Sequence, residues 1–282
     1  YENLTKLQSD RYQFVAPYFD FYHNPISFNY GTINISSSGS NIVDNTNNQK
    51  SRIINDISFN FNEKIYENIG LKNNFNIFFK NLNSSGKNVD NYKSSPQIEL
   101  QSLVEIKSEL PMIKSTNLNN HTFIPELSLR LNPGDMKNHA SDKRKINTDN
   151  IFDINRIGVN DSFESGNSLT LGIDYKKENK ENDQKYLQLE LATVFRDSEE
   201  KNIPSETTLH QKNSNLFGSI DYKISESLIF DYNFAVDNNL NNLTYNSIGL
   251  DLSINNFVTK FNFIEEETNL GNTNVFENIS KY

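Results

Sequence analysis

The stretch Asn150–Tyr175, NIFDINRIGVNDSFESGNSLTLGIDY, decides the fold. A polar loop signature leads directly into a strand whose residues alternate between apolar and polar. Successive side chains of an extended strand point to opposite faces of a sheet. One face therefore carries Leu169, Leu171, Ile173 and Tyr175, and the other carries Ser168, Thr170, Gly172 and Asp174. The pattern predicts a sheet with one apolar face and one hydrated face.

The composition argues against a single dry core. Only 35% of the 282 residues are hydrophobic, which is low for a compact soluble domain of this length. No run approaches the roughly 18 consecutive apolar residues of a membrane-spanning helix, so strands would have to cross any membrane. Position 1 is Tyr and no signal-peptide pattern opens the chain, so we expect a signal peptide to be missing or removed and the chain to be a piece of something longer.

Charge and residue content exclude several function classes. A net charge of −9 argues against nucleic acid as a partner, because binding phosphates needs clustered Lys and Arg. The chain has no Cys, so it has neither disulfides nor thiolate metal sites. The four histidines are isolated, with no carboxylate or second His at ligand spacing, and no phosphate-binding glycine loop or nucleophile elbow is present. We expect no enzyme activity, catalytic residue, cofactor or metal.

Alternation with a period of two residues predicts about thirteen strands, each roughly 9 to 12 residues long, a length that suits a tilted crossing of a bilayer. Ordinary soluble strands are shorter, at about 5 to 6 residues. Besides the strand of Ser168–Tyr175, the predicted strands are Tyr12–Tyr22, Ile26–Ser36, Arg52–Asn62, Leu71–Asn81, Gln97–Lys107, His121–Leu131, Lys185–Arg196, Asn215–Ile224, Leu228–Asp237, Ile248–Ile254 and Phe257–Glu265.

The two faces of these strands predict two environments. A charge facing lipid near the midplane of a bilayer costs roughly 2 to 4 kcal/mol, whereas a charge facing a watery lumen costs little. Four carboxylates fall on the polar face, and we predict that they face the lumen: Asp174, Asp221, Asp231 and Asp251. The residues predicted to face lipid are Leu169, Leu171, Ile173, Phe230, Phe234, Leu250 and Leu252.

The connections alternate between short turns and longer polar loops, as in outer-membrane barrels. This parity requires Asn132–Asn167 to be one external loop, with Asn150–Gly166 an ordered part that can fold into the lumen. One interpretation of this loop is a hydrated surface segment; the other is a segment that touches a plug protein or an amphiphilic, phosphorylated substrate. The other long loops are predicted at Ser37–Lys50, Leu82–Ser95 and Asp197–Asn213, and around Ser108–Asn120 the flanking strands are expected to overrun the membrane.

Alternation alone also fits a soluble sandwich or solenoid, since soluble antiparallel sheets have one apolar face. Strand length and loop parity favour the barrel, while the absence of Trp from the expected aromatic girdles weighs slightly against it. Backbone groups in hydrocarbon must all be paired, which requires a closed sheet. We therefore predict an all-β fold: an antiparallel transmembrane β-barrel segment with long external loops, in which residues 1–282 form part of one barrel domain, the barrel is incomplete, and both edges are open.

The chain resembles the family of the outer-membrane lipopolysaccharide-assembly protein LptD. The resemblance extends over Asn119–Val258 and rests on the strand HTFIPELSLRL with Pro125, and on a strand ending in Phe195-Arg196-Asp197 followed by a polar loop and the turn in SIDYKISESLIFDYNF. Between these lie the signature positions Asn155, Arg156, Asp161, Glu164 and Gly166, in the family's order. The family's Phe-Ser-Gly is replaced by Ile157-Gly158-Val159, and its Arg after the Asp is replaced by Ser162.

The resemblance implies a function without covalent chemistry. A protein of this family is a large barrel in the cell outer membrane that receives lipopolysaccharide and assembles it into the outer leaflet. Its partners would be lipopolysaccharide, outer-membrane lipids, an LptE-like plug lipoprotein, and a periplasmic LptA-like bridge that docks through regions outside this chain. The signature positions would belong to a lumen or loop site. The alternatives are another outer-membrane barrel, such as a porin-like channel or ligand receptor, and a soluble β-rich adhesin.

Overall fold

The computed structural model describes residues 12–44, 47–89, 91–182, 185–268 and 271–282. These residues form one antiparallel sheet of sixteen strands, thirteen of which follow one another from edge to edge. The edge strands are β1 (Gln13–Tyr22) and β16 (Gly271–Lys281), each paired on one side only among the described residues. The sixteen strands confirm the predicted all-β fold, and the two singly paired strands confirm the predicted open edges.

The strands between the two edges run in sequence order, and three short strands pair beside them. The inner strands of the path are β3 (Gly31–Asp44), β4 (Gln49–Phe61), β6 (Leu71–Lys87), β7 (Gln97–Glu109), β9 (Asn119–Asn132), β10 (Gly166–Asn179), β11 (Tyr186–Arg196), β12 (Leu216–Ser225), β13 (Leu228–Val236), β14 (Leu243–Ile254) and β15 (Phe257–Thr268). The short strands are β2 (Ile26–Phe28), which pairs with β3, β5 (Lys64–Tyr66), which pairs with β6, and β8 (Met112–Ser115), which pairs with β9.

The first predicted strand pair differs from the structure. The predicted strand Ile26–Ser36 is broken by a turn at 29–30, and β3 begins at Gly31, where a Cβ atom would lie 2.1 Å from the carbonyl oxygen of Asn60. Only glycine allows β3 and β4 to approach so closely. The predicted loop Ser37–Lys50 is mostly strand, apart from residues 45–46, which lie outside the described residues.

Strand β6 also extends into a predicted loop, Leu82–Ser95, and reaches Lys87; residue 90 lies outside the described part. Polar side chains on both faces hide the alternation in these extensions. They hydrogen-bond across strands instead: the hydroxyl of Ser51 donates to the Oδ1 atom of Asn41 over 2.7 Å. Within Ser108–Asn120 the strands continue, because β7 reaches Glu109 and the short β8 pairs with β9; that they overrun the membrane there stays a prediction.

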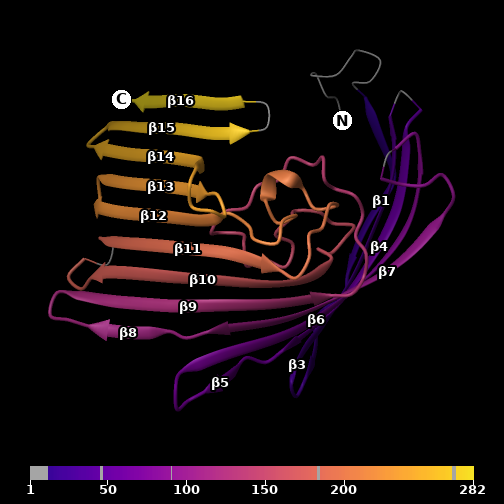
Figure 1. The fold of residues 1–282 in the computed structure, drawn as a ribbon, viewed down its shortest axis with the longest axis horizontal. Helices are drawn as coiled ribbons and strands as arrows, with labels where there is room; N and C mark the ends of the chain where they lie inside the picture. The colour runs from indigo at the N-terminus through magenta and orange to yellow at the C-terminus, as the bar shows by residue number, and fades with distance from the viewer. Residues whose placement is uncertain (1–11, 45–46, 90, 183–184, 269–270) are drawn as a thin grey trace.

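Two long connections, residues 133–165 and 197–215, lie between the two arms of the curved sheet, as Figure 1 shows for the coil around the short 3₁₀ helix η2 (Ser205–Thr207). We call the segment 133–165 the inner loop and the sheet face on which it packs the inner face. In the described part of the chain, no helix is long and apolar enough to cross a membrane.

The buried apolar cluster joins these connections to the sheet. It contains residues of both loops and of β11, β12 and β13: Met136, Ile146, Ile151, Ile157, Val159, Ala192, Val194, Ile203, Leu209, Phe217 and Ala235. The described residues contain no second sheet to cover the outer face. Large apolar side chains remain exposed there, among them Leu171 and Leu250.

Candidate functional site: the inner loop and its polar network

The inner loop is a packed element of the structure. Ile151 is completely buried and Ile157 nearly so, and both belong to the apolar cluster. The interpretation of this segment as a hydrated surface loop is therefore wrong for its central part. The backbone turns tightly at Gly158, whose φ of 66° falls in the left-handed region that favours glycine.

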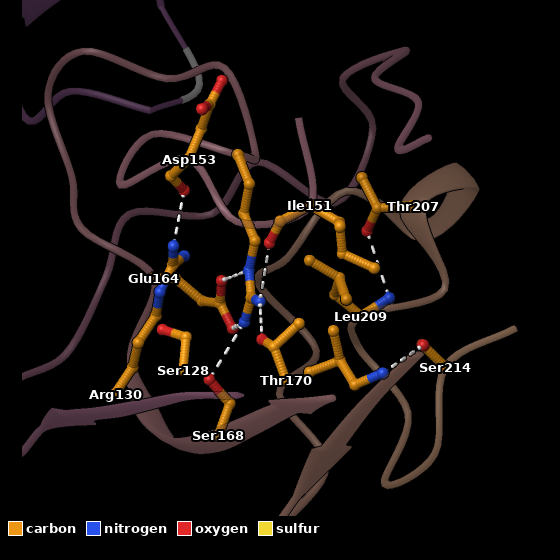
Figure 2. Close-up of polar contacts among 12 residues, drawn as sticks. Ser128, Arg130, Ile151, Asp153, Glu164, Ser168, Thr170, Thr207, Leu209 and Ser214 are labelled. Carbon is orange, nitrogen blue, oxygen red and sulfur yellow. Dashed lines mark hydrogen bonds and ion pairs between the residues drawn. The ribbon is translucent and has the colours of Figure 1, made fainter. Parts of the chain in front are cut away.

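Arg156 is the centre of the loop's polar contacts and is only 3% exposed. Its Nε atom donates to Oε2 of Glu164 over 2.6 Å, and its Nη2 atom donates to Oε1 over 2.7 Å. The remaining donors reach the sheet, at the hydroxyl oxygens of Ser168 (2.9 Å) and Thr170 (2.7 Å). Figure 2 shows these oxygens and the carbonyl oxygen of Ile151 gathered around the same guanidinium group. This fork of donors fixes the loop to β10.

A second arginine completes the site around Glu164. Arg196, at the end of β11, donates to the carboxylate of Glu164 and to the carbonyl oxygen of Ser165. Burial by itself would raise the pKa of the Glu164 carboxyl, but the charges of Arg156 and Arg196 outweigh burial and hold that pKa well below its usual value. Glu164 is therefore an anion between two cations.

Gly166 lies next to Glu164 and Arg196, at a position that favours glycine. It has a φ of 79°, and a Cβ atom would lie 2.9 Å from the Nη2 atom of Arg196. The residue lets the chain turn from the inner loop into β10 while Arg196 crosses over it.

Arg130, on the inner face of β9, forms a second anchor. Its Nε atom donates to Glu105 of β7 over 3.1 Å, and Glu105 also accepts from the hydroxyl of Ser128 over 3.1 Å. Its Nη2 atom donates to the carbonyl oxygens of Phe152 (2.8 Å) and Asp153 (2.7 Å) in the inner loop. The contact to Asp153 is visible in Figure 2. A charged side chain of the sheet thus binds backbone carbonyls of the inner loop.

Asp161 is the third anchor, on the side of β6 and β7. Its carboxylate accepts a hydrogen bond from the hydroxyl of Tyr92 and lies 2.9 Å from Nε2 of His139. The other ring nitrogen of His139 lies 2.9 Å from the carboxylate of Asp142. Strand β7 adds Gln101, whose side chain accepts from the backbone N–H of Phe163 over 2.7 Å and so ties the loop to the sheet.

The charges of this third anchor support one another. Burial alone would raise the pKa of Asp161, but hydrogen bonds with His139 and Tyr92 hold it well below its usual value. Burial alone would lower the pKa of His139, yet its contacts with Asp161 and Asp142 raise it. For Tyr92, burial and the nearby Asp161 charge both raise the pKa, so its hydroxyl stays protonated and donates.

The second long connection packs beside the inner loop. Its buried residues include Ile203 and Leu209, and the hydroxyl of Thr207 accepts from the backbone N–H of Leu209 over 3.2 Å. Ser214 binds the end of β11 by accepting from the N–H of Val194 over 2.9 Å, as drawn in Figure 2. The two connections therefore form one ordered body on the inner face.

The structure brings together only part of the predicted signature. Arg156 pairs with the carboxylate of Glu164, and Gly166 lies beside this pair. Asp161 lies in the neighbouring anchor. Asn155 is exposed and contacts Asn160, outside the network.

The predicted carboxylates of the strands share the inner face. Asp174 is on the same side of β10 as Ser168, which binds the inner loop, and the strand register carries the other three to that side. The predicted lipid-facing residues Leu169, Leu171, Ile173, Phe230, Phe234, Leu250 and Leu252 occupy the opposite, outer face.

Several network residues were missed from the sequence. The histidines were expected to be isolated, and this is wrong for His139, which contacts two carboxylates. The sequence carried a signal for one of these two carboxylates, because Asp142 lies three residues after His139. Glu105 and Arg130 also carried a signal, as charges on inner-face positions of alternating strands; Tyr92 carried none. Within the described residues, no group of three or more His, Cys, Asp or Glu side chains is arranged to hold a metal ion.

Comparison with known proteins gives one family. The family model of LptD, described as LPS transport system D, matches residues 13–279. No curated protein matches the chain. The matched span contains all three anchors of the inner loop, from Tyr92 to Arg196.

Proposed function

The chain belongs to the LptD family of lipopolysaccharide transport proteins, and from this premise we propose that its curved sheet is part of the wall of an outer-membrane barrel that assembles lipopolysaccharide into the outer leaflet. The family is one of transport proteins rather than enzymes, with a role in outer-membrane biogenesis. The proposed mechanism is passage of an amphiphile along a hydrated inner face, without covalent chemistry, and residues 1–282 would be one part of that barrel domain.

One observation carries the proposal: the two faces of a single sheet have opposite character. The outer face exposes apolar side chains such as Leu171 (39% exposed) and Leu250 (37% exposed). The inner face carries Asp174, Asp231 and the charged anchors of the inner loop. Apolar exposure on this scale is costly in water and favourable against lipid tails, while the polar side suits sugar and phosphate groups.

The same premise gives the proposed partners. Lipopolysaccharide is the substrate of the family, and the finer proposal is that an LptE-like lipoprotein plugs the lumen and an LptA-like periplasmic bridge delivers the substrate through regions outside this chain. The inner loop supports the first of these. Its packed, internally hydrogen-bonded body offers a plug protein a preformed surface, which lowers the cost of ordering the loop on binding.

The facing of the wall can be tested by single-cysteine labelling of the intact protein in outer membranes, with the unsubstituted protein as the control for background labelling, because residues 1–282 contain no Cys. Asp174→Cys and Asp231→Cys are expected to react with a water-soluble, membrane-impermeant maleimide. Leu171→Cys and Phe234→Cys are expected to resist it and, once labelled with a fluorophore in detergent and returned to lipid, to be quenched by nitroxide lipids. Equal labelling of the two sets contradicts a lipid-facing wall.

Transport is tested by depleting the protein in cells and measuring how much newly made lipopolysaccharide reaches the cell surface. Depletion is expected to abolish its arrival, and the wild-type gene supplied on a plasmid to restore it. Unchanged arrival, combined with conductance of small solutes by the purified protein, would indicate a porin-like channel and overturn the proposal.

A further inference from the structure

A polar cavity of about 450 Å³ lies between the inner loop and the first strands of the sheet. Its walls are the inner face of β1, β3, β4 and β6 on one side and residues of the inner loop, including Asn160 and Phe163, on the other. The volume falls in the range of small-molecule sites. The anchors of Arg156 and Arg130 bind the loop elsewhere, whereas the third anchor borders the cavity, because its Tyr92 interacts with Arg52 of the cavity wall.

Unused hydroxyl groups line the strand side of the cavity. Ser36, Ser38 and Ser40 alternate along β3, so their side chains share the inner face. Among the described residues, none of these hydroxyls has a side-chain hydrogen bond, in contrast to Ser37 on the outer face, which donates to Asn55 over 2.7 Å. A column of free hydroxyls in a polar cavity is able to bind the hydroxyl and phosphate oxygens of a ligand.

Charged side chains of both signs also line the cavity: the carboxylates of Asp20 and Asp56, and the cations of Arg52 and Lys80. The ammonium group of Lys80 lies 2.6 Å from the carboxylate of Asp56 and 5.0 Å from the ring centre of Phe163. Arg52 lines the same wall and interacts with the side chain of Tyr92, but no carboxylate in the described part of the chain forms an ion pair with it. Its planar guanidinium group presents two parallel donors, the geometry that phosphate accepts.

The inner face beyond the loop is more negative. There Asp174 stands directly across from Glu190, and Asp221 stands directly across from Asp231. Asp251 lies on the next strand and pairs with Lys260 over 2.5 Å. The inner loop thus separates a hydroxyl-lined cavity on β1 to β6, where Asp20 and Asp56 balance Arg52 and Lys80, from an acidic strip on β10 to β14. An anionic ligand is repelled more by the strip than by the cavity, where Lys80 is paired with Asp56 and Arg52 has no carboxylate partner among the described residues.

We propose that this cavity binds the phosphorylated saccharide portion of the transported glycolipid, with the serine column contacting sugar hydroxyls and Arg52 contacting phosphate. The inference rests on the proposed function for its ligand, and adds where on the inner face the headgroup is held. It assigns the acidic strip no part in headgroup binding.

Photo-crosslinking in the intact protein tests the position. Tyr22 lines the cavity, and Tyr186 is an inner-face tyrosine on the acidic side, so each can be replaced by azidophenylalanine with little change in shape. With purified lipopolysaccharide as the probe, we expect at least fivefold more crosslinked product from position 22 than from position 186. Equal products, or an excess at position 186, would overturn the inference.

Competition identifies the chemical group and its source. Excess glucosamine phosphate is expected to reduce crosslinking at position 22, whereas unphosphorylated glucosamine is expected to leave it unchanged. Equal competition by both sugars removes phosphate from the inference. If radiolabelled glucosamine phosphate binds to the protein but lipopolysaccharide forms no crosslink, the cavity takes free sugar phosphates and the glycolipid assignment is wrong.

A variant pair tests the residue assignment. Arg52→Gln is expected to weaken crosslinking of lipopolysaccharide at position 22 about tenfold, since a charged hydrogen bond to phosphate is lost. The matched control is Lys223→Gln, which removes an inner-face cation on β12 and is expected to change nothing. Equal losses in both variants would mean that only net charge matters and would overturn the assignment to Arg52. Surface arrival of lipopolysaccharide, measured separately, reports on the proposed function even where the crosslinking result is negative.

Discussion

The wall of strands and the inner loop bury their side chains in opposite ways. The strands of the wall expose large apolar side chains on the outer face, with Leu171 39% exposed, and among the described strands only β11 to β13 also bury apolar side chains in the cluster beneath the two long connections. The inner loop, which has no regular strand, contains fully buried residues such as Ile151, together with the charges of Arg156 and Glu164. The wall therefore depends on paired backbone and on its surroundings, whereas the loop depends on its own packing and ion pairs.

This difference predicts where mutations act. A substitution in the loop that removes a buried partner should disturb the loop while leaving the strand ladder intact, because the ladder is held by backbone hydrogen bonds. A substitution on the outer face should affect insertion of the wall while leaving the loop intact. Four experiments test this separation.

The largest effect is expected for Glu164→Gln. The change keeps the shape of the side chain but leaves the guanidinium groups of Arg156 and Arg196 buried without their carboxylate. Breaking a buried ion pair by removing one partner costs about 3–5 kcal/mol. Amide hydrogen exchange in the inner loop should accelerate by more than a hundredfold, while exchange in β10 stays slow.

The control is Glu67→Gln, at an exposed turn position, which should change neither rate. If Glu164→Gln accelerates exchange equally in the strands and in the loop, then wall and loop unfold together and the comparison fails.

A cavity in the apolar cluster comes next. Leu209 is completely buried among residues of both long connections, and Leu209→Ala should cost about 2–5 kcal/mol through lost contacts and an unfilled space. Limited proteolysis is expected to cut segment 197–215 first. Leu118→Ala, at a side chain that is 62% exposed, should cost less than about 0.5 kcal/mol. Resistance of the Leu209 variant to the protease would mean that the cluster does not hold the loops.

These two regions also differ in how far the sequence predicts them. Alternation along Ser168–Tyr175 predicts the strand, its facing and its neighbours, because the signal is local and repeats every second residue. The order of strands follows from short connections between consecutive elements. Strand ends were missed where both faces lack apolar side chains, as in Ser37–Asn41 of β3, because no alternation remains to be detected.

The inner loop could not be predicted to the same extent. Its packing joins Ile151 to Leu209 and Phe217, which are far apart in the sequence and follow no period. The signature residues Arg156 and Glu164 were identified by resemblance, but nothing in their spacing indicates that Arg196 completes their site. Contacts of this kind depend on which loops the fold brings together, and a single sequence does not contain that information.

The outer face is tested by Leu171→Lys. Its neighbours across the ladder are Leu127 and Thr193, so the new ammonium group has no carboxylate opposite it. If the outer face contacts lipid, the cost is about 2–4 kcal/mol near the midplane, and urea unfolding of the protein in lipid vesicles should shift accordingly. Asp174→Lys on the inner face of the same strand is the control and should shift far less. Equal shifts would mean that the two faces meet the same environment.

The smallest effect concerns the pH dependence of the loop through His139. Its folded pKa is raised by Asp161 and Asp142, so protonated His139 stabilises the loop fully below its unfolded pKa of about 6.5, and this contribution is lost as the pH rises through the folded pKa. Asp161 has a lowered pKa, and its contribution is lost only as the pH falls well below about 4, outside this window. Between about pH 6 and pH 9, hydrogen exchange corrected for its intrinsic pH dependence should therefore show the inner loop losing about 1 kcal/mol of protection, while β10 loses none.

His139→Gln keeps a hydrogen-bonding side chain without the titration, so its loop protection should be lower at pH 6 and independent of pH. A pH-dependent loss of the same size in the variant would assign the titration to another group and separate the third anchor from the stability of the loop.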